Sequence, residues 1–142
     1  MATSHQLRIL RVPGRFAVCR LSPADGVPPW ATGHGFVSIT RTADELSIVC
    51  AEAVVPRGTD CMRGYIAMRV EGTLAPDLVG VLVSVAKPLA DAGIPILAIG
   101  THDTDYVLVR EVDYERAVDA LQHAGHEVDP GQGITFPAKR VN

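Results

Sequence analysis

A polar stretch interrupts the apolar second half of the chain. Between apolar runs at residues 94–99 and 106–112 stand five polar residues in a row: Thr101, His102, Asp103, Thr104 and Asp105. Asp and Thr side chains satisfy turn backbone groups by themselves, so a surface β-turn explains Asp103 and Thr104 as well as a binding site does. Asp105 differs, because it begins the second apolar run and Asp is disfavoured in strands. We therefore expect Asp105 to meet a ligand, with Thr101, Asp103 and Thr104 as polar walls beside it.

The other side chains that could do chemistry are dispersed along the sequence. The five histidines have no metal-ligand spacing; they are His5, His34, His102, His123 and His126. His102 and Asp103 could form a catalytic dyad, but neighbouring residues of a strand point to opposite faces. The sequence has no nucleophile elbow, P-loop or dinucleotide-binding fingerprint. We expect a protein that is not an enzyme and that holds no metal and no cofactor.

The cysteines give no sign of a zinc or redox motif. Cys19, Cys50 and Cys61 are odd in number and widely spaced, without a C-x-x-C pair. Cys19 and Cys50 lie in apolar runs and are expected to be buried thiols that act as small hydrophobic side chains. Cys61 stands among two arginines and an aspartate, a setting that suits a reactive thiol, although no histidine is near it in the sequence.

Composition describes an ordinary globular protein with a real core. The 142 residues are 47% hydrophobic and 20% charged, with a formal net charge of −3. Because there is no basic run and only 5% of the residues are aromatic, we expect no nucleic-acid partner. The first residues lack the apolar core of a signal peptide, and no stretch approaches the roughly 20 apolar residues of a membrane span. We expect a cytoplasmic protein without a membrane partner.

The second half begins with a strand and a helix. Residues 65–70 have β character, and the apolar residues then take helical spacing, at Leu78, Val81, Leu82, Val85 and Leu89. Asp77 suits the first turn of this helix and Gly93 its left-handed exit. Pro88 has no amide hydrogen, so it should leave the Ser84 carbonyl without its helical partner and kink the last turn.

A hairpin and a second helix complete this half. Residues 94–99 and 106–112 read as two strands joined by the polar turn. Asp113 can cap a helix that Gly125 ends and whose apolar face consists of Tyr114, Ala117, Val118 and Leu121. Residues 126–128 form a short last strand. The order β-α-β-β-α-β predicts an α+β, ferredoxin-like sandwich, in which two helices cover one face of an antiparallel sheet.

The first half resembles a poorer copy of the same plan. Residues 7–12 and 16–21 are strand-like, residues 27–31 allow a short helix at most, and 36–40 with 45–50 form a hairpin. A second helix is hard to find around Pro56, so this half has lost one. We expect a degenerate unit at residues 1–64, a complete unit at residues 65–130 and a tail at residues 131–142.

Three segments carry a resemblance to a known family. They are "VEGTLAPDLVGVLVSVAKP" at residues 70–88, "LADAGIPILAIGTHDTDYVLV" at residues 89–109 and "ELSIVCAEAVVP" at residues 45–56. They resemble small tandem ACT-domain proteins, the group related to the CASTOR-type arginine sensors and to the regulatory ACT domains of aspartate kinase. The family's hairpin motif is a small-residue strand, then S/T-x-x-T-D-aromatic, and residues 101–106 match it throughout.

The resemblance implies a regulatory protein that binds a small molecule, commonly an amino acid, between paired ACT domains. A homodimer or higher oligomer is usual in this family. The chain has no kinase, dehydrogenase or transporter segment to regulate, so its output would pass through another protein, which the sequence does not name. The CASTOR-type role needs four domains and does not carry over. The other reading left open is an interaction or assembly module that binds no metabolite.

The loop before the first helix contributes to the ligand groove in ACT domains. The resemblance therefore implies that Asp77, Leu78 and Val79 are ligand-binding residues. Exposed amides at a helix start suit the carboxylate of an amino acid, because the helix dipole favours an anion there. Asp77 could accept the ammonium of such a ligand, although capping of the helix is the simpler role for an aspartate.

Overall fold

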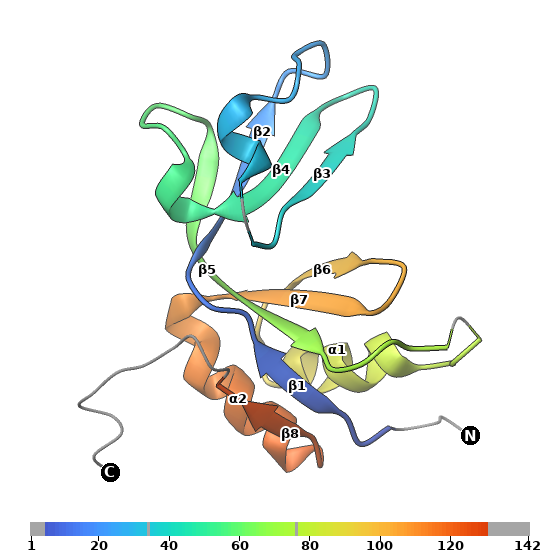
Figure 1. The fold of residues 1–142 in the computed structure, drawn as a ribbon. Helices are drawn as coiled ribbons and strands as arrows, with labels where there is room; N and C mark the ends of the chain where they lie inside the picture. Colours follow the sequence, from blue (N-terminus) through green and yellow to red (C-terminus); the bar gives the residue numbers. More distant parts are fainter. Residues whose placement is uncertain (1–4, 34, 76, 131–142) are drawn as a thin grey trace. The chain divides into compact units, whose positions relative to one another are not determined.

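The computed structural model describes residues 5–33, 35–75 and 77–130. They form two compact units (Figure 1). The large unit lies within Met1–Pro13 and Ile66–Asn142, and the small unit is Gly14–Tyr65. The expected tail at 131–142 lies outside the described residues. Neither of the two described α-helices has the length or apolar character needed to cross a bilayer.

The large unit contains the predicted β-α-β-β-α-β order and one additional strand. Its elements are β1 (Arg8–Arg11), the second half of β5 (Cys61–Val70), α1 (Val81–Asp91), β6 (Leu97–Gly100), β7 (Asp105–Arg110), η3 (Glu111–Asp113), α2 (Tyr114–His123) and β8 (Glu127–Asp129). Its strands pair in the order β8-β1-β5-β7-β6. The predicted α+β, ferredoxin-like class is confirmed, with β1 inserted between the first and last strands of the motif.

The position of β1 corrects the expected domain boundary. Residues 7–12 were expected in the first unit, but Ile9 lies opposite Val70 of β5, antiparallel, and opposite Val128 of β8, parallel. Arg8 donates to Glu71 and also forms ion pairs with Glu127 and Asp129. The hydrogen bond and charge of Glu71 raise the pKa of Arg8. Strand β1 therefore completes the large unit, through pairing that no local sequence signal reveals.

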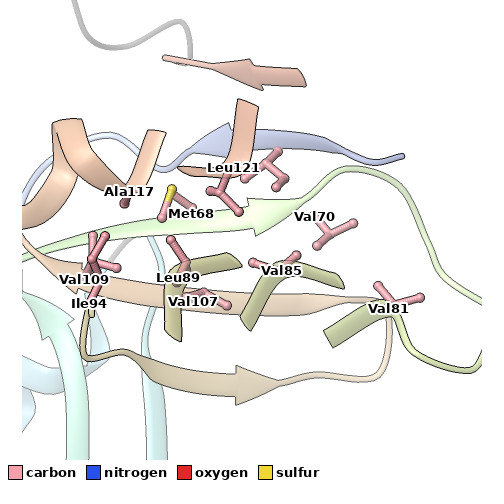
Figure 2. Packing of buried hydrophobic residues seen from close by; sticks show 11 residues of the cluster. Met68, Val70, Val81, Val85, Leu89, Ile94, Val107, Val109, Ala117 and Leu121 are labelled. Atoms are coloured by element: carbon pink, nitrogen blue, oxygen red, sulfur yellow. The ribbon is translucent and has the colours of Figure 1, made fainter. Parts of the chain in front are cut away.

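Both helices pack on one face of the large unit's sheet. Figure 2 shows this core, in which α1 contributes one side chain per turn through Val81, Val85 and Leu89. Strands β5 and β7 point alternate side chains at the helices, and α2 adds Ala117 and Leu121. Burying each large aliphatic side chain contributes about 1.5 to 3 kcal/mol, so this face dominates the stability of the unit.

Helix α1 starts later than its apolar spacing predicts. Its N-cap is Gly80, in the left-handed conformation at φ 86°, which suits glycine because other residues are strained there. Leu78 and Val79 are exposed and lie in the preceding loop. Asp77 is also in this loop, so its expected place in the first turn of the helix is wrong. The predicted exits of the two helices are confirmed, since Gly93 and Gly125 have positive φ.

A histidine occupies the gap that Pro88 leaves in α1. The Ser84 carbonyl accepts a hydrogen bond from Nε2 of the buried His126 at 2.8 Å. The other ring nitrogen, Nδ1, accepts from the Leu7 amide at 3.1 Å, which fixes the neutral tautomer with its hydrogen on Nε2. Pro88 thus stays inside the helix, as expected from the sequence, and His126 satisfies the freed carbonyl.

The start of α2 differs from its prediction. Asp113 is at the N-cap, but its side chain makes no capping hydrogen bond. Its carboxylate instead accepts from Arg116 at 3.0 Å.

The small unit is an antiparallel sheet with two short 3-10 helices. Its elements are β2 (Phe16–Leu21), η1 (Pro29–Thr32), β3 (Ser38–Arg41), β4 (Leu46–Ala51), η2 (Glu52–Val54) and the first half of β5, and the strands pair in the order β3-β4-β2-β5. The predicted hairpin is present, as β3 and β4. The described residues of this unit contain no α-helix, which agrees with the prediction that this half has lost one. One face carries a separate core around Leu46 and Ile48.

Candidate functional site

A cavity of about 290 Å³ opens in the large unit beside the start of α1. It lies among the loop after β5, the first turn of α1 and the β6–β7 turn. The structure brings together here five of the expected site residues, Leu78, Thr101, Asp103, Thr104 and Asp105. Asp77 and Val79 are not among the described residues that line it.

Two threonines build the β6–β7 turn. The Thr101 amide and hydroxyl both donate to the Thr104 carbonyl, at 2.8 and 3.0 Å, and the Thr104 amide donates to the Thr101 hydroxyl. Thr104 is only 7% exposed, and its hydroxyl donates to the carbonyl of Val70 at 2.8 Å. These bonds account for both hydroxyls without a ligand.

Asp103 serves the loop through its backbone. Its carbonyl accepts from the Leu74 amide at 2.7 Å, which ties the loop before α1 to the turn. Its carboxylate lies 2.9 Å from Nδ1 of His102, and both side chains are exposed. The expectation that these two side chains point apart is wrong, because they lie in the turn rather than in a strand. The described lining has no serine, cysteine or lysine that such a pair could activate.

Asp105 is the carboxylate of this cavity that the fold leaves available. It opens β7 opposite Gly100, and a Cβ built on Gly100 would lie 3.5 Å from the Asp105 carboxylate. Within the part of the chain that the structure describes, no hydrogen bond or ion pair joins this carboxylate to another residue. A half-buried carboxylate without a partner suits a cationic group of a ligand.

The start of α1 presents the opposite polarity to the same cavity. Gly80 provides no side-chain cap, and the first turn holds no acidic residue. The Gly80 carbonyl accepts from both the amide and the hydroxyl of Ser84, each at 2.9 Å. Among the described residues, no side chain caps the first amides of α1, those of Val81, Leu82 and Val83. The positive end of the helix dipole favours an anion beside them.

Sequence reasoning missed three contributors to this arrangement. Gly80 acts through the side chain that it lacks, and a glycine directly before an apolar helix was an available signal. Gly100 contributes as the residue opposite Asp105 in the β6–β7 ladder. No such signal pointed to His5. Its Nε2 donates to the Val79 carbonyl at 2.8 Å, and its amide donates to the Ser84 hydroxyl at 3.2 Å. His5 thereby fixes the loop from outside the cavity.

The rim of the cavity carries a group of exposed apolar side chains, which we call the apolar rim. It consists of Leu78, Val79, Leu82 and Val83, of which Val79 is 74% exposed. Among all the residues that the structure describes, those of the cavity included, no group of three or more histidine, cysteine or acidic side chains has an arrangement that could hold a metal ion.

Comparison with known proteins places this geometry in a family. A family model of the ACT domain matches residues 61–123, and a second model, of an N-terminal domain, matches residues 14–58. An X-ray structure of a protein from Agrobacterium tumefaciens is 37% identical, with a TM-score of 0.88 over 94% of this chain and 99% of that one. The chain belongs to the ACT-domain family. No curated protein matches it.

More distant structures share the fold of this ACT-domain protein. An aspartate kinase from Clostridium acetobutylicum, described as an allosteric enzyme, is 13% identical with a TM-score of 0.62, over 87% of this chain and 36% of that one. The regulatory subunit of aspartate kinase from Thermus thermophilus is 9% identical with a TM-score of 0.55, over 78% of this chain and 93% of that one. The predicted resemblance to tandem ACT-domain proteins of the aspartate kinase group is confirmed.

Proposed function

We propose that this ACT-domain protein is a non-enzymatic regulatory module that binds an amino acid and passes the bound state to another protein. One observation carries the proposal: an available carboxylate and an uncapped helix start line the same cavity. An amino acid carries the two complementary groups. Its ammonium would meet Asp105, and its carboxylate would meet the first amides of α1.

The size and walls of the cavity fit a small ligand. Its volume of about 290 Å³ is near the lower end of ordinary ligand sites. Leu74, Leu78 and Val81 supply apolar wall for a side chain, while the polar atoms are confined to the turn and the helix start. The regulatory subunit and allosteric enzyme among the similar structures support a regulatory role for this fold, whose output requires a partner.

A thermal-shift screen against the amino acids tests the proposal. A ligand that binds only the folded state stabilises it by RT ln(1 + [L]/Kd), about 2.7 kcal/mol at a hundredfold excess over Kd. Each hit is then titrated by calorimetry beside two analogues, the amine that lacks the carboxylate and the N-acetylated acid that lacks the ammonium. We expect both analogues to bind more weakly. A screen without any hit, or a hit that tolerates both analogues, contradicts the proposed site.

A second function is favoured by the apolar rim. Four neighbouring exposed aliphatic side chains are unusual for a solvated surface and mark a place where another protein can dock. In this alternative, the chain is an interaction or assembly module that binds no metabolite. If calorimetry detects no heat of binding with any amino acid, and the chain forms a stable complex with another protein, this alternative is favoured over the sensor.

A further inference from the structure

The small unit gathers all three cysteines on one face of its sheet. Cys61 lies directly opposite Cys19 across the β2–β5 ladder, and Cys50 lies opposite Ala17 across the β2–β4 ladder. Residues 17 and 19 of a strand share a face, and opposite residues share it too. The three side chains therefore lie together, although the sequence separates them widely, and all three are free thiols.

Cys19 and Cys61 form a non-hydrogen-bonded cross-strand pair. The Arg20 amide donates to the Asp60 carbonyl at 2.9 Å, so residues 20 and 60 are a hydrogen-bonded pair and the next pair along the ladder is not. Such pairs have Cα atoms about 4.5 Å apart, within the range of about 4.4 to 6.8 Å for disulfides. Cys50 is diagonal to Cys19, and diagonal neighbours are about 7 to 8 Å apart, too far for a bond without movement.

The two thiols of the pair differ in access. Cys61 is half-buried and lines a cavity of about 520 Å³ in the small unit. The Arg63 guanidinium holds one wall of this cavity, since it donates to the carbonyls of Glu52, Val55 and Pro56. Cys19 is only 1% exposed. Burial, with the neighbouring Cys50 and Cys61, raises the pKa of Cys19 to about 12, so Cys19 is a poor first nucleophile.

We propose that Cys61 and Cys19 are a site of reversible oxidation, at which a peroxide enters the cavity at Cys61 and the pair closes to a disulfide. The Cys61 sulfur attacks one peroxide oxygen and the O–O bond breaks, which gives a sulfenic acid and one water. The Cys19 sulfur then attacks the Cys61 sulfur, the S–S bond forms, and the hydroxyl leaves with the Cys19 proton as a second water. The two thiols lose two electrons, and a dithiol reductant restores them.

Peptide mapping of the full chain tests this site. The folded protein is treated with one equivalent of hydrogen peroxide. It is then unfolded in denaturant that contains the alkylating agent, so that the buried thiols also react, and is digested with trypsin without reduction. We expect residues 16–20 linked to residues 58–63, and an alkylated Cys50 in residues 42–57. Dithiothreitol should separate the linked peptides.

Two variants provide the matched comparison. Cys50→Ala should form the same link at the same rate, whereas Cys61→Ser should leave both remaining thiols open to alkylation after the same treatment. A link that contains Cys50, a link between two chains, or Cys61 oxidised to the sulfinic acid beside an alkylatable Cys19 would each overturn the proposal. So would a protein that keeps all three thiols. If the Cys61 variant does not fold, the peptide map of the chain without substitutions decides the proposal by itself.

Discussion

Asp105 is the first residue of β7, a position in a strand where aspartate is disfavoured. Its neighbour across the ladder is Gly100, which leaves the carboxylate in open space at the cavity rather than against another side chain. The threonines of the same turn are different, because their hydroxyls donate hydrogen bonds to backbone carbonyls, that of Thr101 to Thr104 and that of Thr104 to Val70. The two kinds of residue should therefore respond oppositely to substitution.

Replacing Asp105 by Asn should weaken the binding of the amino acid and leave the fold intact. Asn keeps the shape and part of the hydrogen bonding but removes the charge, so we expect a loss of about 1.5 to 3 kcal/mol in binding, the range for hydrogen bonds to charged groups. Titration calorimetry and thermal melting on the same variant measure both quantities. Asp103→Asn is the control, since the exposed Asp103 carboxylate already faces His102. Unchanged affinity with a lowered Tm would instead assign Asp105 to the turn alone.

Replacing Thr104 by Val should destabilise the large unit. The change keeps the volume of the side chain but leaves the buried Val70 carbonyl without its hydroxyl donor, which costs about 1 to 3 kcal/mol. Denaturant unfolding measures the loss. Thr104→Ser keeps the hydroxyl and should lose less. Equal losses in both variants would show that the hydrogen bond contributes little.

At the scale of elements, α1 depends on a residue that is far away in the sequence. A proline inside a helix leaves a carbonyl without its amide partner, and here His126 supplies the donor from beyond the end of α2. The same ring accepts from the Leu7 amide, next to β1. One buried imidazole therefore links the N-terminal segment to the middle of α1.

Replacing His126 by Leu should cost about 2 to 4 kcal/mol, because two backbone groups lose their partners at once. Pro88→Ala gives the Ser84 carbonyl a backbone donor, so it should recover part of this loss in the double variant. A double-mutant cycle by denaturant unfolding measures the coupling, which we expect to exceed about 0.5 kcal/mol. His123→Ala is the control, since His123 is exposed and its ring hydrogen-bonds the Asp119 carbonyl within its own helix. Strict additivity would mean that the ring does not compensate for the proline.

Local sequence patterns predicted most of the helices, strands and turns, but they did not predict which distant strands pair. The hairpin of β6 and β7, the glycine exits at Gly93 and Gly125 and the missing helix of the small unit all follow from turn chemistry and periodicity. The apolar spacing extended α1 back to Leu78, because periodicity does not register that Gly80 is left-handed. The partner of β1 was misplaced, since strand pairing depends on the whole sheet. For the site, both the polar turn and an anion-binding helix start were visible in the sequence, whereas the place where the helix starts, after Gly80 rather than near Asp77, was not.

At the scale of the whole molecule, the apolar rim and the family resemblance favour a homodimer of ACT units. We expect light scattering at high micromolar concentration to give the mass of a dimer, with and without amino acid. Val79→Glu should shift this mass toward the monomer, because it places a charge in the apolar rim without touching the lining of the cavity. Val112→Glu is the matched control, since Val112 is 82% exposed and lies away from the rim. A strictly monomeric mass under all conditions would rule out a pocket shared between subunits.

The insertion of β1 between β5 and β8 sets an order for folding during synthesis. The small unit is complete once the ribosome has released Tyr65, whereas the sheet of the large unit waits for β8, which ends at Asp129. Domains generally fold as units, the N-terminal ones first. Here β1 is synthesised first but stays unpaired while the small unit, the next 50 or so residues of the chain, folds. A nascent chain stalled before β8 should therefore contain a protease-resistant small unit and an open edge on β1, which is a ready surface for a chaperone.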